Sequence, residues 1–257
     1  MKSPHSSVSQ AVPNLICRLL SFLCVTASPL HALDAKLNAP APVMREVSPG
    51  VYEIGSIHLD KNTRALSFPA KLNMADGNIE YLICTPRGST HESLILTDVQ
   101  PSDLHFAMLL LDAKGAGILA PATGDAPPSQ INAEYLKGAP QLKGDPLTIT
   151  AKWKDAAGKE QTAAVEDWVL NSKQNKPAPR GPWIYTGSMF ADNQFLAQLQ
   201  GSIASLVSNP SALINNPRKG SDNDQIWMVN TKAVPAVETP VEVTIKFDSI
   251  PDRKPKK

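Results

Sequence analysis

The sequence predicts a strand-rich α+β fold, with mostly antiparallel sheet and one or two short helices. Apolar and polar side chains alternate with a period of two in several segments, which is typical of strands that bury one face. The 257 residues include 23 prolines, and this content favours many short elements joined by turns over long helices. Helical spacing of apolar residues stands out only at 101–112.

The first strands are expected to begin near Val47. Residues 51–57 favour extended chain, a turn is expected at 60–62, and a second strand follows at about 64–68. We interpret this segment as a β-hairpin.

The most regular alternation lies at 79–84, where Ile79, Tyr81 and Ile83 alternate with Glu80, Leu82 and Cys84. Pro86 and Gly88 fit the second and fourth positions of a type I turn. We therefore predict a second hairpin, in which 91–97 returns as the partner strand.

A single helix is predicted at 101–112. Pro101 suits the first helical position, where its missing amide hydrogen is not needed. One apolar face, expected to pack on the sheet, is formed by Leu104, Ala107, Met108 and Leu111.

The second half of the chain is expected to follow a long surface loop at 114–144, which is rich in glycine, proline and alanine. Further strands are predicted at 147–153, at 162–170, around Trp183 and Tyr185, at 203–207 and at 241–247.

The N-terminal segment has the features of an export signal. No acidic residue precedes Asp34, and basic residues come before an apolar run of about a dozen residues that contains Pro29. A membrane-spanning helix needs about 20. We expect residues 1–32 to be a cleaved signal peptide and 33–45 a flexible lead-in, with no transmembrane anchor after cleavage.

Cleavage after Ala32, or alternatively after Ala35, would leave a periplasmic or secreted protein. The mature chain would then consist of one strand-rich domain at 46–250 and a basic tail at 251–257. Cys84 would be its only cysteine, which we expect to be a buried core residue without a disulfide.

The balance of charge argues against nucleic acid as a partner. The formal net charge is +1, whereas nucleic-acid binding relies on a basic surface. The chain lacks a glycine-rich phosphate loop and a glycine-flanked serine nucleophile. We therefore predict no cofactor.

Four segments give the chain a family resemblance. They are "IEYLICTPRGSTHESLILTDVQPSDLHFAMLLLDA" within 77–113, "DWVLN" at 167–171, "GPWIYTGSMF" at 181–190 and "VPAVETPVEVTI" near the end. With these motifs the chain resembles the YdjY-type domain, a family of exported bacterial proteins, over about 46–248. The resemblance implies a domain type and no particular reaction. Some relatives carry cysteine-rich iron-sulfur segments, from which a mature chain with one cysteine departs.

The candidate site consists of polar residues around the predicted second hairpin: Glu80, His91, Glu92 and Ser93. His91 and Glu92 could supply a metal ligand and a carboxylate. Adjacent side chains on a strand point to opposite faces, so these two should not converge on one ion unless a bulge intervenes. We accordingly predict no metal site.

Other polar residues receive structural interpretations. His105 should lie at the edge of the helix's apolar face, His58 has no evident partner, and 222–224 should be a polar turn without a calcium ligand at the required spacing. The four tryptophans are expected to anchor the core, although one of them could line a ligand groove.

The favoured hypothesis is a non-catalytic binding or envelope-associated module, whose partner is a protein or small ligand of the envelope. One alternative is a metal-dependent enzyme or factor centred on His91, Glu92 and Glu80. Another is a structural partner in an envelope assembly.

Overall fold

The structure is a computed structural model, and it describes residues 43–115, 142–191 and 193–248. The expected signal peptide, most of the lead-in, residues 116–141 of the long loop and the basic tail lie outside the described residues. The first strand begins at Met44, three residues before its expected start.

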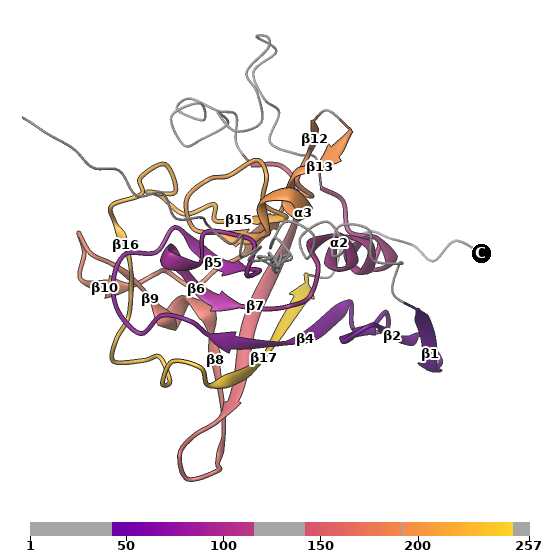
Figure 1. Cartoon of the computed structure of the whole chain (residues 1–257), viewed down its shortest axis with the longest axis horizontal. Coiled ribbons are helices and arrows are strands. Elements are labelled where there is room, and N and C mark those ends of the chain that lie inside the picture. Colours follow the sequence, from indigo (N-terminus) through magenta and orange to yellow (C-terminus); the bar gives the residue numbers. More distant parts are fainter. Residues whose placement is uncertain (1–42, 116–141, 192, 249–257) are drawn as a thin grey trace, which may run out of the picture. The chain divides into compact units, whose positions relative to one another are not determined.

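Figure 1 shows the described elements coloured in chain order, from indigo near the N-terminus to yellow near the C-terminus. The helices are α2 (Pro101–Leu110) and α3 (Leu196–Gln200), with 3-10 turns η1 (Thr90–Glu92) and η3 (Val165–Trp168). The strands are β1 (Met44–Ser48), β2 (Val51–Ile54), β3 (Ile57–Asp60), β4 (Ala65–Leu72), β5 (Tyr81–Cys84), β6 (Ser93–Leu96), β7 (Asp145–Lys154), β8 (Glu160–Ala164), β9 (Val169–Asn171), β10 (Lys176–Pro177), β11 (Trp183–Tyr185), β12 (Phe190–Ala191), β13 (Gln194–Phe195), β14 (Ser202–Ser205), β15 (Ile214–Asn215), β16 (Trp227–Val229) and β17 (Pro240–Phe247).

Eight of these strands close into a barrel in the order β4-β17-β7-β11-β15-β14-β5-β6, and β6 pairs back onto β4. The β5–β6 and β14–β15 pairs are parallel, and the other barrel pairs are antiparallel. The part of the chain that the structure describes is strand-rich with two α-helices, in line with the predicted one or two, but the expectation of mostly antiparallel sheet is corrected to a closed, mixed barrel. Closure leaves these eight strands without free edges.

The predicted second hairpin is wrong, because β5 and β6 run parallel, with Ile83 opposite Ile95 and Cys84 opposite Leu96. Residues 85–92 carry the chain back to the start of the sheet and contain η1. So short a crossover suffices because each strand has only four residues. Side chains on both faces of β6 are buried, so the sequence pattern held no information about strand direction.

The long strands match the sequence prediction most closely. Strand β17 pairs along its length with β4 on one side and β7 on the other, with Val243 opposite Phe68 and Ala151. Alternate residues of β17 are buried, because one face lines the barrel interior and the other faces outward. The predicted strand 147–153 is likewise confirmed within β7.

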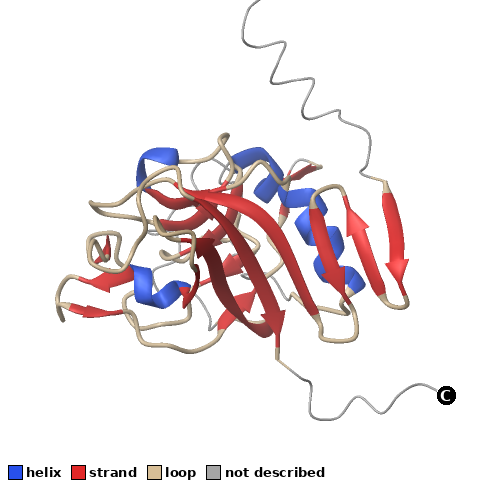
Figure 2. Cartoon of the chain, turned by 90° about the horizontal axis from the view of Figure 1, so that it is seen from below, coloured by secondary structure: helices blue, strands red, loops and turns tan. Residues whose placement is uncertain are grey.

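Strands β1, β2 and β3 form a wing that leaves the barrel at β4 (Figure 2). Strand β3 pairs with Ala65–Ser67 of β4, whereas β6 pairs with Lys71 and Leu72. Pro69 lies between the two sections, and its carbonyl accepts a hydrogen bond from Thr97 Oγ1 at 2.7 Å. An amide hydrogen at position 69 would point to the same side as this carbonyl, toward the gap between β3 and β6. Proline has no such hydrogen, so the missing donor falls at the point where β3 and β6 diverge, which we call the fork.

Helix α2 confirms the predicted helix and begins at Pro101. Its expected apolar face is buried, and the helix contacts β3 and α3. Three of the four tryptophans, Trp168, Trp183 and Trp227, are fully buried. Trp153 is partly buried and packs edge-on against Trp168, with ring centroids 5.2 Å apart.

Candidate functional site

The predicted polar residues lie where the chain enters β5 and β6. The backbone N–H of Glu80 donates to the carbonyl of Glu92 at 2.9 Å. His91 Nε2 lies 3.8 Å from Glu92 Oε2. His91 and Glu92 converge, contrary to the expectation from strand geometry, because both belong to the η1 turn and not to a strand.

The charge of Asp224 acts on Glu80, an interaction that the sequence analysis did not predict. Partial burial raises the pKa of Glu80, the negative charges of Glu92 and Asp224 raise it further, and His91 opposes them. Ser93 does not share this surface, because it is buried and its Oγ donates to the carbonyl of Ser89. The structure therefore joins the backbones of Glu80 and Glu92 and brings His91 close to Glu92, while Asp224 acts on Glu80 through its charge.

This cluster has limited chemistry. His91 is 80% exposed, so its imidazole is largely solvated. Within the residues that the structure describes, no group of three or more His, Cys, Asp or Glu side chains is placed to hold a metal ion.

The remaining histidines occupy separate positions. His105 Nδ1 lies 2.7 Å from the hydroxyl of Tyr185, and burial lowers the pKa of His105. This is the structural role expected for it at the edge of the helix face. His58 lies on β3 and is exposed.

Cys84 is fully buried and free, as predicted. Burial raises the pKa of its thiol to about 11, against the effect of a hydrogen bond with Ser93. Because the thiolate is the nucleophilic form, Cys84 is not poised for chemistry at neutral pH.

A more open candidate site lies on the outer wall of the barrel, over β3, β4, β17, β7 and β8. A hollow of about 430 Å³ is present there. Register explains its position, because short outward side chains such as Ser67 and Pro69 lie beside long ones such as Glu242 and Lys152. Its other lining residues are Ser56, His58, Phe68, Trp153, Lys154, Glu160, Pro240 and Val241.

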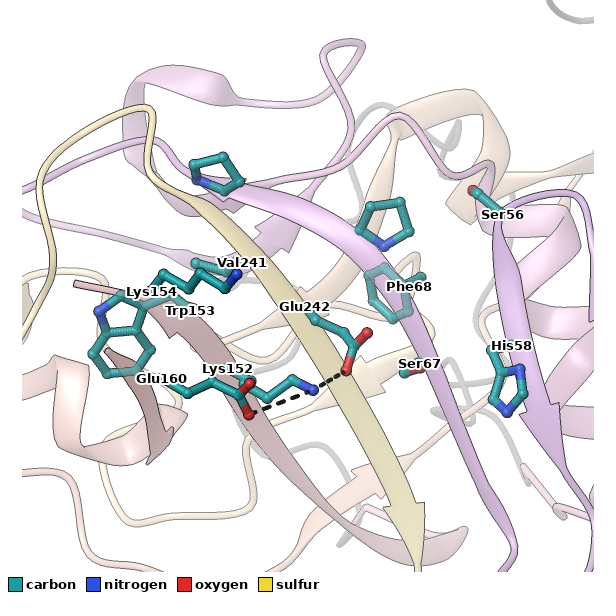
Figure 3. Close-up of a pocket in the computed structure, with 12 residues that line it drawn as sticks. Ser56, His58, Ser67, Phe68, Lys152, Trp153, Lys154, Glu160, Val241 and Glu242 are labelled. Carbon is teal, nitrogen blue, oxygen red and sulfur yellow. Dashed lines mark ion pairs between the residues drawn. The ribbon is translucent and has the colours of Figure 1, made fainter. Parts of the chain in front are cut away.

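Charges of both signs line this hollow (Figure 3). The ammonium of Lys152 lies 3.3 Å from Glu242 Oε1 and 3.9 Å from Glu160 Oε1. Lys154 comes from the same strand, and His58 stands across the hollow on β3. The hollow thus offers two cations, two carboxylates and an imidazole around a floor that includes proline and aromatic side chains.

A second hollow of about 430 Å³ lies at the fork where the wing leaves the barrel. It shares Ser56 and Pro69 with the first, so the two adjoin. Its remaining lining residues are Ala70, Lys71, Pro86, Leu96, Thr97, Asp98 and Val99. We call the two hollows together the wall groove.

Sequence reasoning foresaw that a tryptophan could line a groove, and Trp153 does so. It did not find the wall groove, because the lining residues come from several strands whose order the sequence did not reveal. The available signal was Pro69 within an otherwise regular strand, since proline in a strand marks an edge or a change of partner.

Comparison with protein-family models identifies the family of the chain. The model of the YdjY domain matches residues 57–246, which is most of the chain. The chain belongs to the YdjY domain family. The matched region runs from β3 to β17 and includes every lining residue of the wall groove except Ser56. No curated protein and no solved structure matches the chain. None of the described helices of this YdjY domain is long and apolar enough to cross a membrane.

Proposed function

We propose that this YdjY domain is an exported, non-catalytic binding module that holds an extended ligand of mixed charge in the wall groove. The observation that carries the proposal is that two adjoining hollows, each of about 430 Å³, share Ser56 and Pro69. Each volume falls in the range of small-ligand sites, about 300–1,000 Å³. Their continuity suits a ligand longer than one compact small molecule.

The charges around the wall groove support a ligand that carries both signs. Lys152 is engaged by two carboxylates, whereas no ion pair is found for Lys154 among the described residues. A ligand carboxylate can therefore pair with Lys154 without displacing an internal partner. Asp98 in the second hollow offers a site for a ligand cation. A short peptide segment of an envelope protein has this combination of charge and extended shape.

Export is supported by the order of charge, apolar run and small residues in the first 32 residues. N-terminal sequencing of protein recovered from the periplasm or medium tests it. We expect the mature chain to start at Leu33, or at Lys36 if the second site is used. Recovery of uncleaved protein only from the cytoplasm would refute export.

The binding test uses amide chemical shifts of the isotopically labelled mature protein, titrated with acidic, basic and zwitterionic short peptides. We expect the zwitterionic peptides to give saturable shifts in β4, β17 and β7. Ser67→Trp, which fills the hollow, should abolish them. Thr148→Trp is the matched control, because Thr148 is exposed on β7 but does not line the hollow. Shifts that survive Ser67→Trp, or no shifts with any peptide, would contradict the proposal.

The metal-dependent alternative retains one favourable observation, the approach of His91 to Glu92. The donor set argues against it, because one exposed imidazole with carboxylates is a weak ligand set for zinc. Elemental analysis of the purified mature protein distinguishes the two hypotheses: stoichiometric metal that is lost in His91→Ala would favour the alternative.

A further inference from the structure

The wall groove crosses the strands of the barrel wall and does not follow any one of them. The register of β17 with β7 places Lys154 beside Pro240. Pro240 lies opposite Lys71 of β4, and Lys71 lies opposite Leu96 of β6. These four residues line the two hollows and form one row across four strands. Because neighbouring strands are about 4.8 Å apart, the row is about 14 Å long.

The strands under this row offer no free backbone edge to a ligand. Strand β17 is paired along its length with β4 and β7 (Figure 3), β7 pairs on its other side with β11 and β8, and β6 pairs with β5. At the fork, Pro69 has no amide hydrogen and its carbonyl already accepts from Thr97 Oγ1. Strand β8 is bonded to β7 alone among the described strands, but only its Glu160 lines the groove. A ligand therefore cannot join the sheet as an added strand, which needs a row of unpaired N–H and C=O groups.

The polar groups that are left open in the wall groove are mostly hydrogen-bond donors. Among the described residues, Lys154 has no ion pair, and the hydroxyls of Ser56 and Ser67 have no hydrogen bond. The two carboxylates of the first hollow are engaged by Lys152, which leaves the exposed carboxylate of Asp98 as the open acceptor of the second. A prolyl residue has a carbonyl acceptor and no amide donor. A proline-rich segment therefore brings no N–H group that would lose its hydrogen bond to water at this floor.

The polyproline II conformation also matches the spacing of the row. This helix has three residues per turn and rises about 3.1 Å per residue, so positions i and i+3 on one face are about 9.3 Å apart. Every second strand of a sheet is about 9.6 Å apart. A segment of about five or six residues covers the distance from Lys154 to Leu96. Asp98, two residues beyond Leu96, then lies at the far end of the segment.

We propose that the wall groove binds a proline-rich segment of about five or six residues in the polyproline II conformation. The segment lies across β7, β17, β4 and β6, with its acidic end at Lys154 and its basic end at Asp98. It is recognised through side chains and through its own carbonyl groups, without a backbone ladder. This inference rests on the function proposed for the groove and specifies the class of its ligand.

The test compares the binding of two peptides of six residues with free ends to the mature chain. One peptide consists of prolines, and the other alternates threonine and valine, which favour a strand. The charges at the ends are the same, so a difference in Kd reports the main chain and its conformation. We expect saturable amide shifts in β7, β17, β4 and β6 with the proline peptide and a Kd at least about fivefold lower than that of the threonine–valine peptide.

The path of the segment is tested at its two ends. Lys154→Met should weaken binding of the proline peptide about two- to fivefold, as expected for an exposed ion pair, and amidation of the peptide's carboxyl end should then have no further effect. Asp98→Asn should give the same result with acetylation of the amino end. Lys246→Met is the matched control, because Lys246 is exposed on β17 but does not line the groove. It should leave the Kd unchanged.

The possible failures can be told apart. Equal or tighter binding of the threonine–valine peptide overturns the inference and leaves the function proposed for the groove intact. Binding of the proline peptide that is insensitive to both Lys154→Met and Asp98→Asn also overturns the inference. No saturable shift with these peptides or with the zwitterionic peptides described above contradicts the proposed function itself, and the inference with it.

Discussion

Strands β4, β17 and β7 form one part of the barrel wall, and β14, β15, β5 and β6 form another. The first three are eight to ten residues long and bury alternate side chains. The other four have two to four residues each and are almost completely buried. The long-strand part is held by regular ladders. The short-strand part depends on specific side chains and on close backbone approach.

In and beside the short-strand part, buried polar side chains make hydrogen bonds that backbone ladders make in the long-strand part. Asn215 Nδ2 donates to Thr186 Oγ1 and to the carbonyl of Asn209, each at 2.9 Å. Asn216 Nδ2 donates to the carbonyl of Leu206. Such buried bonds leave unsatisfied groups when one partner is removed. Substitutions should therefore cost more stability here than on the long strands.

The largest expected difference concerns ion pairs. Arg218 Nη2 lies 2.6 Å from Glu166 Oε1, both side chains are nearly buried, and Trp183 Nε1 donates to the same oxygen. Arg218→Met leaves the Glu166 charge without its partner and should cost about 3–5 kcal/mol in urea unfolding. Lys152→Met, which removes the exposed ion pairs with Glu242 and Glu160, should cost about 0–1 kcal/mol. Equal losses would show that burial does not decide what these ion pairs contribute to stability.

A glycine pair gives the next largest contrast. Gly201 has φ +64°, and a Cβ there would lie 2.3 Å from Thr85 Oγ1 and 2.7 Å from the Gly88 nitrogen. Gly201→Ala should therefore cost about 2–4 kcal/mol.

Gly158, in the β7–β8 turn, has φ +76°, but a Cβ there would meet nothing within 4 Å. Gly158→Ala should cost only about 1 kcal/mol, from backbone strain alone. Thermal unfolding of the two variants compares them directly. A cost for Gly158→Ala as large as that for Gly201→Ala would show that contact with residues 85–88 is unimportant.

A smaller effect should appear as a pH dependence at Glu80. Because its folded pKa is raised, the folded state binds more protons than the unfolded state between the ordinary carboxyl pKa and the raised value. Stability should therefore fall as pH rises through that window. Glu80→Gln should flatten this part of the Tm–pH curve and raise Tm slightly at pH 7. An unchanged curve would show that neither burial nor the neighbouring carboxylates raise the pKa of Glu80.

The smallest expected effect is at Cys84, where the folded protein should not react. Its thiol is buried, with a pKa raised to about 11. Peptide mapping after treatment with iodoacetamide at pH 8 should show Cys84 unmodified in the native protein and fully modified in urea. Rapid native labelling would mean that the short-strand part opens often.

The same contrast explains what the sequence could predict. Period-two alternation located 147–153 and 241–247, because each of these strands has one face toward the barrel interior and one toward solvent. Helical spacing and Pro101 located α2. For β5 and β6 the alternation of 79–84 indicated a strand, but burial on both faces left its partner's direction undetermined. The predicted hairpin was wrong for that reason.

The candidate site was predictable in part. His91, Glu92 and Glu80 were selected as residues, and their approach depends on the η1 turn, which the sequence interpretation assigned to a strand. Asp224 comes from a distant part of the sequence, so no local pattern could connect it with them. The wall groove required the order of the strands and the branch at Pro69, both of which are properties of the closed sheet.

Pro69 also bears on how the molecule opens. Because Pro69 cannot donate at the fork, the backbone ladder between β3 and β4 is limited to Ala65–Ser67, while the barrel is closed independently by β6. The wing therefore has a shorter ladder to the barrel than the barrel strands have to one another, and its amide hydrogens should exchange with deuterium before those of the barrel. A ligand bound at the fork would contact Ser56 on the wing and Thr97 beside the barrel. Binding should therefore slow the exchange of amide hydrogens in β3.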